Sequence, residues 1–242
     1  TNFLFVFAGH FLLCSPCSRH TAGEPCHLPA ASTGIWPSQL VIGNFFDILS
    51  AINVPKRGFR KLAVFTHRIA TPHDVPAIIE LMGAAIEENM KPFLSPAEIE
   101  AAKETMGVDA SLIRDQTYFL IESALDGHTT LVGCGGWGKR KTLYGGDHTV
   151  GRDDSLSDPA RDAARIRAMY THPAWTRCGI GTLLIELGEN AARDAGFSRI
   201  ELGATIPGEP FYLARGYVEI GRDTHVAANG AESIVIRMVK EL

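Results

Sequence analysis

The 242-residue sequence predicts a mixed α/β domain over most of its length. Three observations support this fold class. Apolar stretches of strand length alternate with amphipathic segments of helical period. Two of the amphipathic segments begin with a hydroxyl residue followed by Pro, which is a typical helix start. No apolar run approaches the ~18 residues of a membrane-spanning helix, and neither an internal repeat nor a coiled-coil pattern is present.

The elements are expected in the order strand, two helices, three strands, helix, strand, helix and two strands. Thr71-Pro72 begins a helix over 72–89, and Ser95-Pro96, with Glu98 completing a capping box, begins one that ends near 106. The strands are expected at 62–70, 117–123, 130–137, 164–171, 199–204, 218–221 and 233–239, and the other helices at 179–195 and 209–215.

Residues 1–60 form an N-terminal extension of unknown role and loop-like, disorder-prone composition, so the domain itself is expected over 61–242. The apolar run 3–13 has no basic residue before it and contains His10, which argues against a secretion signal. A cytoplasmic location is therefore expected. Cys14 and Cys17 could form half of a zinc site, but the adjacent pair Cys26-His27 is poorly spaced to complete it, and no metal is expected.

The overall charge excludes one class of partner. The formal net charge is −4 and the isoelectric point is near 6.1, so there is no general basic field for gripping nucleic acid. Apolar residues make up 45% and charged residues 21%, which excludes a wholly disordered chain. We expect neither a nucleic-acid nor a membrane partner, and a homodimer is compatible with the sequence.

A glycine-containing loop carries the most specific signal. Arg177, Cys178, Gly179, Ile180, Gly181 and Thr182 lie between an expected strand and an expected helix. Unpaired N–H groups at a helix N-terminus suit a phosphate, and glycine lets the ligand approach the backbone. Tight packing of a strand-to-helix turn would use the same glycines. A dinucleotide fingerprint lacks its third glycine at Leu184, and Gly138-Lys139 is not followed by the Ser or Thr of a Walker loop.

With Thr205 and the segment 211–217 added, residues 61–242 resemble the GCN5-related N-acetyltransferase (GNAT) superfamily. This resemblance implies a mostly antiparallel central sheet flanked by helices, and acetyl-CoA as co-substrate. It further implies that Met169, Tyr170 and Thr171 meet the pantetheine arm and acetyl group, and that residues 177–182 hold the pyrophosphate. Two positions depart from the family pattern: Thr176 stands where Arg or Gln is usual, and Thr205 where Asn is frequent.

Acetyl transfer to an amine requires a proton for the departing thiolate. The resemblance places a general acid at Tyr212, whereas Phe211, Tyr212 and Tyr217 could instead form an aromatic lid on the core. A backbone N–H of the strand 169–171 could stabilise the oxyanion. The base stays open, with a water chain or one of several side chains as candidates: Glu122, Asp147, His148 and Asp153.

The polar insertion 138–162 is expected either to form one wall of the acceptor pocket or to be a solvated loop. The sequence as a whole favours acetyl-CoA-dependent N-acetylation of a small-molecule amine. A protein N-terminus or Lys acceptor, and a non-catalytic acyl-CoA sensor, stay open as alternatives. An aminoglycoside acceptor is compatible with the acidic domain, although the charge is too generic to show it.

Overall fold

A computed structural model describes residues 64–125 and 128–242 of the chain. Three predicted features lie outside the described residues: the extension 1–60, the cysteines considered for a zinc site, and the first residues of the expected strand 62–70. Within them, no helix combines the length and apolar composition needed to cross a bilayer.

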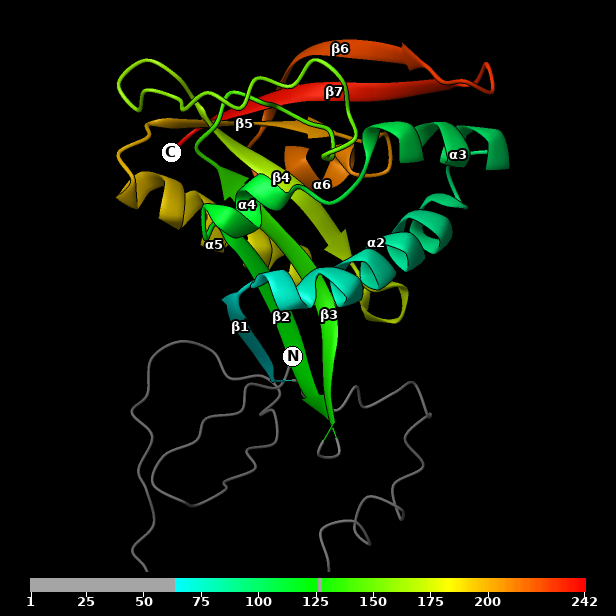
Figure 1. Cartoon of the computed structure of the whole chain (residues 1–242), viewed down its shortest axis with the longest axis horizontal. Coiled ribbons are helices and arrows are strands. Elements are labelled where there is room, and N and C mark those ends of the chain that lie inside the picture. Colours follow the sequence, from blue (N-terminus) through cyan, green and yellow to red (C-terminus); the bar gives the residue numbers. More distant parts are fainter. Residues whose placement is uncertain (1–63, 126–127) are drawn as a thin grey trace, which may run out of the picture. The chain divides into compact units, whose positions relative to one another are not determined.

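Seven strands form one mixed sheet in the order β1-β2-β3-β4-β5-β7-β6 (Figure 1). All neighbouring strands are antiparallel except β4 and β5. The strands are β1 (Phe65–Ile69), β2 (Tyr118–Leu125), β3 (His128–Gly138), β4 (Ala164–Thr171), β5 (Arg199–Ala204), β6 (Val218–Val226) and β7 (Glu232–Glu241). The expected fold class, a mostly antiparallel sheet flanked by helices, is confirmed.

Helices cover both faces of the sheet. The α-helices are α2 (Val75–Met90), α3 (Pro96–Thr105), α4 (Ala110–Arg114), α5 (Ile180–Asp194) and α6 (Glu209–Leu213), with short 3-10 turns at Pro72–Asp74 and Pro173–Trp175. Figure 1 shows α2 crossing in front of β2 and β3, and α5 lying behind them. Ser95 and Glu98 form the expected capping box, since each side chain accepts the other residue's backbone N–H.

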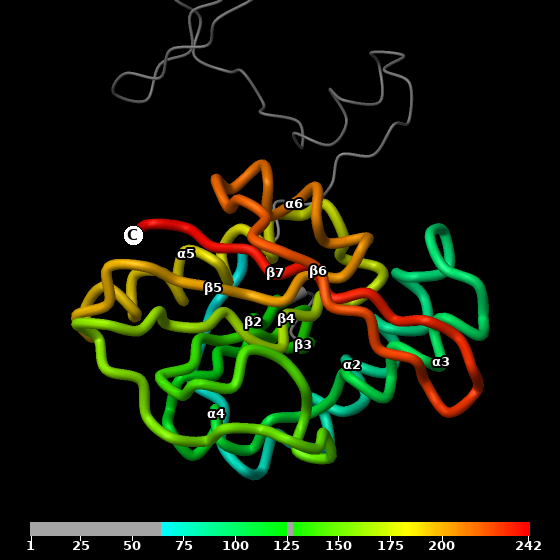
Figure 2. The backbone as a smooth tube through the Cα atoms, turned by 90° about the horizontal axis from the view of Figure 1, so that it is seen from above, coloured from blue at the N-terminus to red at the C-terminus, as the bar shows by residue number. Residues whose placement is uncertain are grey.

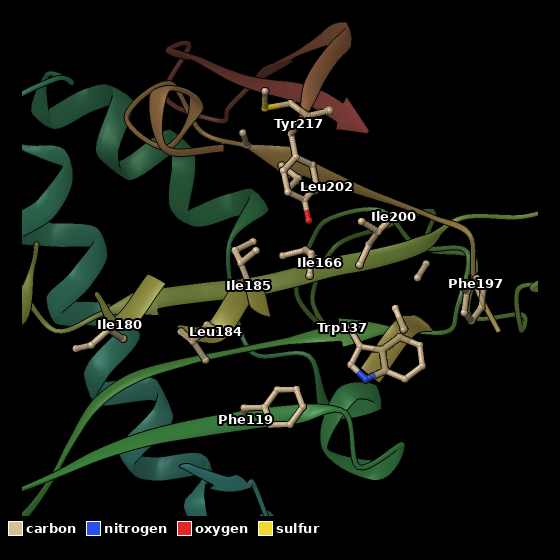
Figure 3. Close-up of a cluster of buried hydrophobic side chains, with 14 of the residues drawn as sticks. Phe119, Trp137, Ile166, Ile180, Leu184, Ile185, Phe197, Ile200, Leu202 and Tyr217 are labelled. Carbon is tan, nitrogen blue, oxygen red and sulfur yellow. The ribbon is translucent and has the colours of Figure 1, made fainter. Parts of the chain in front are cut away.

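The sheet separates two apolar cores. The α5-side core includes Phe119, Trp137, Ile166, Ile180, Leu184, Ile185, Ile200, Leu202 and Tyr217 (Figure 3). The α2-side core includes Ile78, Leu81, Met82, Ile86, Ile99, Leu112, Tyr118, Leu120, Cys134 and Tyr170. Because a strand turns alternate side chains to opposite faces, β3 and β4 contribute to both cores.

The structure differs from the expected elements in two places. The helix α4 was not expected, because its five residues are too short for a helical period to show. The strand β6 extends to Val226, well beyond the predicted 218–221, whereas β7 exceeds the predicted 233–239 only slightly; the two strands form a long hairpin. The end of this hairpin lies beside α3 (Figure 2). There the Glu104 carboxylate accepts the Ala228 backbone N–H at 2.9 Å.

Candidate functional site

The cleft of the molecule opens where β4 and β5 separate. These strands pair only at Ala164↔Ile200 and Arg165↔Glu201, although each continues for several residues beyond that point. Further along, β4 keeps its pairing with β3, and β5 keeps its pairing with β7. The sheet therefore splits between its two halves, and a cleft of about 720 Å³ occupies the opening.

A β-bulge in β4 shapes one wall of this cleft. On β3 only Gly135 lies between the partners of Tyr170 and Arg167, whereas β4 has both Ala168 and Met169 there. Ala168 has a φ of +50°, and its carbonyl accepts a hydrogen bond from Tyr118 at 2.8 Å. A bulge interrupts the ladder and leaves backbone groups unpaired. It thus provides polar backbone at the opening of the sheet.

Glycine at position 135 allows the bulge to pack. A Cβ added there would lie 2.4 Å from the sulfur of Met169, so a larger residue would push the β4 wall outward. Met169 packs on the α5-side core and Tyr170 on the α2-side core. These two side chains therefore point to opposite faces of the sheet at the β4 wall of the cleft.

The glycine loop lies at the cleft and leads into α5. Arg177 and Gly179 both have positive φ values, +62° and +90°, and α5 begins at Ile180 directly after them. Glycine adopts such values without the steric cost that other residues incur. The resulting turn places the unpaired N–H groups of the first turn of α5 at the cleft, where a partial positive charge favours an anion.

Tyr212 lies on α6 on the same side of the cleft. Its ring packs edge-on against Phe211 and Tyr217, with centroids 5.1 Å and 5.8 Å apart. Burial raises the pKa of Tyr212 to about 12, so the phenol keeps its proton at neutral pH. Tyr217 is buried and donates to Glu189 at 3.1 Å. Of these three aromatic residues, Tyr217 belongs to the core, whereas Phe211 and Tyr212 line the cleft.

Most of the residues predicted for the site surround this one cleft. They are Met169, Tyr170, Thr171, Arg177, Gly179, Ile180, Gly181, Thr182, Thr205 and Tyr212, together with Thr176. Cys178 is not among the lining residues, and its sulfur donates to the Thr176 carbonyl at 3.5 Å. The carbonyl of Thr205 accepts the N–H groups of Gly208 and Glu209, so this residue also holds the start of α6.

The four side chains named as candidate bases do not line the cleft. Glu122 forms an ion pair with Arg68 at 3.0 Å, and Asp147 accepts the backbone N–H of Ala110 at 3.0 Å. A ring nitrogen of His148 lies 2.9 Å from the Glu104 carbonyl oxygen, and Asp153 caps the backbone of Ser155. These contacts give all four side chains structural partners away from the site.

A buried ionic cluster that the sequence did not predict attaches the insertion to the cleft. Arg167 on β4 lies 2.7 Å from the carboxylate of Asp109, which also pairs with Arg152 at 2.9 Å. The Arg167 guanidinium further donates to the carbonyls of Thr142 and Gly145, at 2.8 Å and 2.6 Å. The insertion thus lies against β4, and its residues 143–145 line the cleft.

The sequence contains one indication of this ionic cluster, which is the presence of charged residues in an otherwise apolar strand. The strand 164–171 contains two arginines among apolar residues. A buried Arg requires a carboxylate partner, but the sequence does not say which of many acids supplies it. The sequence also did not predict Asn89 as a site residue. Asn89 lines the cleft, and its side-chain amide donates to the Thr171 carbonyl at 2.8 Å.

Comparison with known proteins identifies the family of this chain. The profile of the Acetyltransferase (GNAT) family matches residues 83–217, which is more than half of the chain and includes β4, the glycine loop and Tyr212. The chain belongs to the GNAT acetyltransferase family. No curated protein matched this GNAT chain.

Among solved structures, the GNAT chain is similar to a GCN5-related N-acetyltransferase from Rhodopseudomonas palustris, with 22% identity and a TM-score of 0.51 over 73% of this chain and 95% of that one. It also matches a ribosomal-protein-alanine N-acetyltransferase from Brucella melitensis, with 17% identity, a TM-score of 0.47 and 73% and 99% coverage. The PaiA N-acetyltransferase from Thermoplasma acidophilum, solved with coenzyme A, matches with 15% identity, a TM-score of 0.44 and 74% and 99% coverage. Of these likenesses, the first supports the fold and none identifies a substrate.

Proposed function

We propose that this GNAT protein transfers the acetyl group of acetyl-CoA to the primary amine of a small molecule. One observation carries the proposal: the free N-terminus of α5, the bulged strand β4 and Tyr212 all border a single cleft. Each matches a requirement of the reaction, namely an anion site, polar backbone beside the reacting carbon, and a proton donor.

The proposed cofactor site begins at the glycine loop. N–H groups at the start of α5 would bind the pyrophosphate, with the Arg177 side chain adding charge. The pantetheine arm would run between the separated strands beside Met169, Tyr170 and Thr171, and Thr205 would border it from β5. Residues present at the loop fit this group, because a Cβ at Gly179 would meet open space, which leaves the backbone accessible. No metal enters the proposal.

In the proposed reaction the amine attacks the thioester carbonyl directly. A backbone N–H freed at the bulge of β4 would donate to the developing oxyanion. Collapse of the tetrahedral intermediate breaks the carbon–sulfur bond, and Tyr212 would donate its proton to the departing thiolate. Although the pKa of Tyr212 is near 12, burial disfavours a thiolate as well, and this lessens the mismatch between donor and acceptor.

The lining of the cleft favours an acceptor with an apolar body and a single amine. Around its α2 and β7 side it is lined by Met90, Phe93, Met106, Leu143, Ile234 and Val235. Among the described residues that line the cleft, none is Asp, Glu or His. A polycation such as an aminoglycoside would find no counter-charge there, so this alternative is the weakest.

A protein N-terminus or Lys is the enzymatic alternative, and a non-catalytic acyl-CoA sensor is the alternative from another class. The cytoplasmic location and the homodimer remain predictions from the sequence.

Mass spectrometry after incubation of the full chain with acetyl-CoA and a panel of acceptors would distinguish these functions. The acceptors are phenethylamine, a tetrapeptide with a free N-terminus, an N-terminally blocked Lys peptide and an aminoglycoside. We expect phenethylamine to be acetylated best. Binding of acetyl-CoA without acetylation of any acceptor would favour the sensor.

A further inference from the structure

We propose that Tyr144 and Asp223 form the path by which the acceptor amine loses its proton. This inference rests on the proposed acetyl transfer, in which an N–H bond must break as the carbon–nitrogen bond forms. The four candidate bases from the sequence lie away from the cleft, whereas Tyr144 lines it. The pair joins the insertion to β6, two segments distant in sequence.

The position of Tyr144 in the cleft follows from β5. Ile200, Leu202 and Ala204 belong to the α5-side core, so Gly203 faces the opposite side of the sheet. A Cβ added at Gly203 would lie 3.1 Å from the Tyr144 ring, which therefore packs directly on this glycine. Tyr144 thus borders the opening from the side opposite α5, whereas Tyr212 borders it from the α5 side.

A hydrogen bond connects Tyr144 to a carboxylate that reaches solvent. The Tyr144 hydroxyl donates to Oδ2 of Asp223 at 3.1 Å. The Asp223 side chain is 38% exposed, so a proton that arrives there can pass to water. Arg237 lies 3.3 Å from the other carboxylate oxygen and holds Asp223 in place.

The backbone around Tyr144 is fixed by its neighbours. The carbonyls of Thr142 and Gly145 both accept hydrogen bonds from Arg167, which is itself buried against Asp109. Two anchors on either side of Tyr144 limit the movement of its backbone. A ring held in this way can keep its hydroxyl aligned with Asp223, as a proton path requires.

The proton transfer balances without any further reactant. As the amine bonds to the acetyl carbon, an N–H bond breaks and an O–H bond forms at the Tyr144 oxygen. The original O–H bond of the phenol breaks at the same time, and its proton joins Oδ2 of Asp223, which later releases it to water. Burial, followed by the hydrogen bond to Asp223, raises the pKa of Tyr144, so the side chain acts here as a neutral phenol and not as a phenolate.

The test uses the full chain with acetyl-CoA and phenethylamine as the acceptor probe. The variants are Tyr144→Phe, Asp223→Asn and the two combined. Glu232→Gln, an exposed carboxylate on the same hairpin, is the control. We expect each single change to lower kcat about 10²-fold. The KM for the amine should stay within about twofold, since Phe keeps the packing on Gly203.

The combined variant distinguishes a shared path from two structural effects. If both residues act in one path, breaking it twice costs no more than breaking it once, so kcat of the double variant should match the singles. Unchanged kcat in either single variant, or losses that multiply in the double, would overturn the inference while leaving acetylation by the unmodified protein intact. Failure of the unmodified protein to acetylate any of the four acceptors would instead overturn the proposed function.

Discussion

At the scale of single residues, Tyr212 and Tyr217 show how position separates the side chain proposed as a proton donor from a structural one. Tyr212 and Tyr217 lie five residues apart, and their rings are in contact. Tyr217 donates to a buried carboxylate and lies near Lys240, so its hydroxyl has structural partners. Tyr212 presents its ring to the cleft, and burial alone raises its pKa. Only the environment of Tyr212 suits a proton donor.

Tyr212→Phe removes the proposed proton donor and keeps the ring packing. We expect kcat for acetyl transfer to fall by about 10²–10⁴-fold, with little change in the affinity for acetyl-CoA. Because the phenol loses its proton only near pH 12, the unmodified protein should show no fall in rate from Tyr212 below about pH 11. Steady-state rates from pH 6 to 10 check both points. An unchanged kcat in the variant would remove Tyr212 from the mechanism.

At the scale of elements, the start of α5 connects backbone conformation with binding. Gly179 needs its positive φ to turn the chain into the helix, and Gly181 lies in the first helical turn. A Cβ added at Gly181 would lie 3.2 Å from the Phe211 ring, whereas one at Gly179 would touch nothing. The two glycines are therefore required for different reasons: Gly179 for its positive φ, and Gly181 for the close approach of Phe211.

This difference predicts different outcomes for the two alanine variants. Gly179→Ala should cost about 1–2 kcal/mol in the free energy of unfolding, because alanine is disfavoured in the left-handed region, and it should also weaken acetyl-CoA binding, because its methyl group would enter the open space proposed for the pyrophosphate. Gly181→Ala should weaken acetyl-CoA binding, since the methyl group would lie 3.2 Å from the Phe211 ring and would shift this ring at the edge of the cleft. Denaturant unfolding and calorimetry measure the two effects. Equal affinity for acetyl-CoA in Gly181→Ala and the unmodified protein would contradict this account of the loop.

The elements also show what the sequence could predict and why. Strong local signals, such as the Ser95–Glu98 capping box and the Gly179–Gly181 turn, predicted helix starts within a few residues of those observed. The predicted strand 218–221 was shorter than β6 because most of β6 is exposed. It therefore lacks the apolar alternation that marks a strand. The sequence did not predict the proposed role of Tyr144, because its partners Gly203 and Asp223 lie on β5 and β6, far along the chain.

At the scale of the whole molecule, the Asp109 cluster joins parts that no local pattern connects. Asp109 precedes α4, Arg152 lies in the insertion and Arg167 lies on β4. Burial by itself raises the pKa of Asp109, but the neighbouring guanidinium groups outweigh it and hold the pKa below its usual value of 3.8. A carboxylate with a lowered pKa stabilises the fold above pH 3.8, and this contribution is lost as the pH falls through the lower pKa of the folded state.

Asp109→Asn should therefore lower the free energy of unfolding by about 3–5 kcal/mol at pH 7, because the buried Arg167 guanidinium loses its carboxylate partner, whereas Arg152 keeps Asp147 and Asp154. The difference between the variant and the unmodified protein should begin to shrink below pH 3.8, where Asp109 of the unfolded chain takes up a proton, and should continue to shrink as the pH falls toward the lower pKa of the folded state. Denaturant unfolding from pH 3 to 7 measures this, and Asp194→Asn, an exposed change at the end of α5, is the control. A constant difference across that range would exclude the carboxylate charge as the cause.

The central claim is that the cleft between β4 and β5 binds acetyl-CoA through the start of α5. Calorimetric titration of acetyl-CoA into the purified chain tests it most directly, with NAD as the control ligand and Gly181→Ala as the matched variant. We predict saturable binding of acetyl-CoA, weaker binding by the variant and no binding of NAD. A folded protein that binds neither ligand would contradict the claim, and the family membership would then describe the fold without its chemistry.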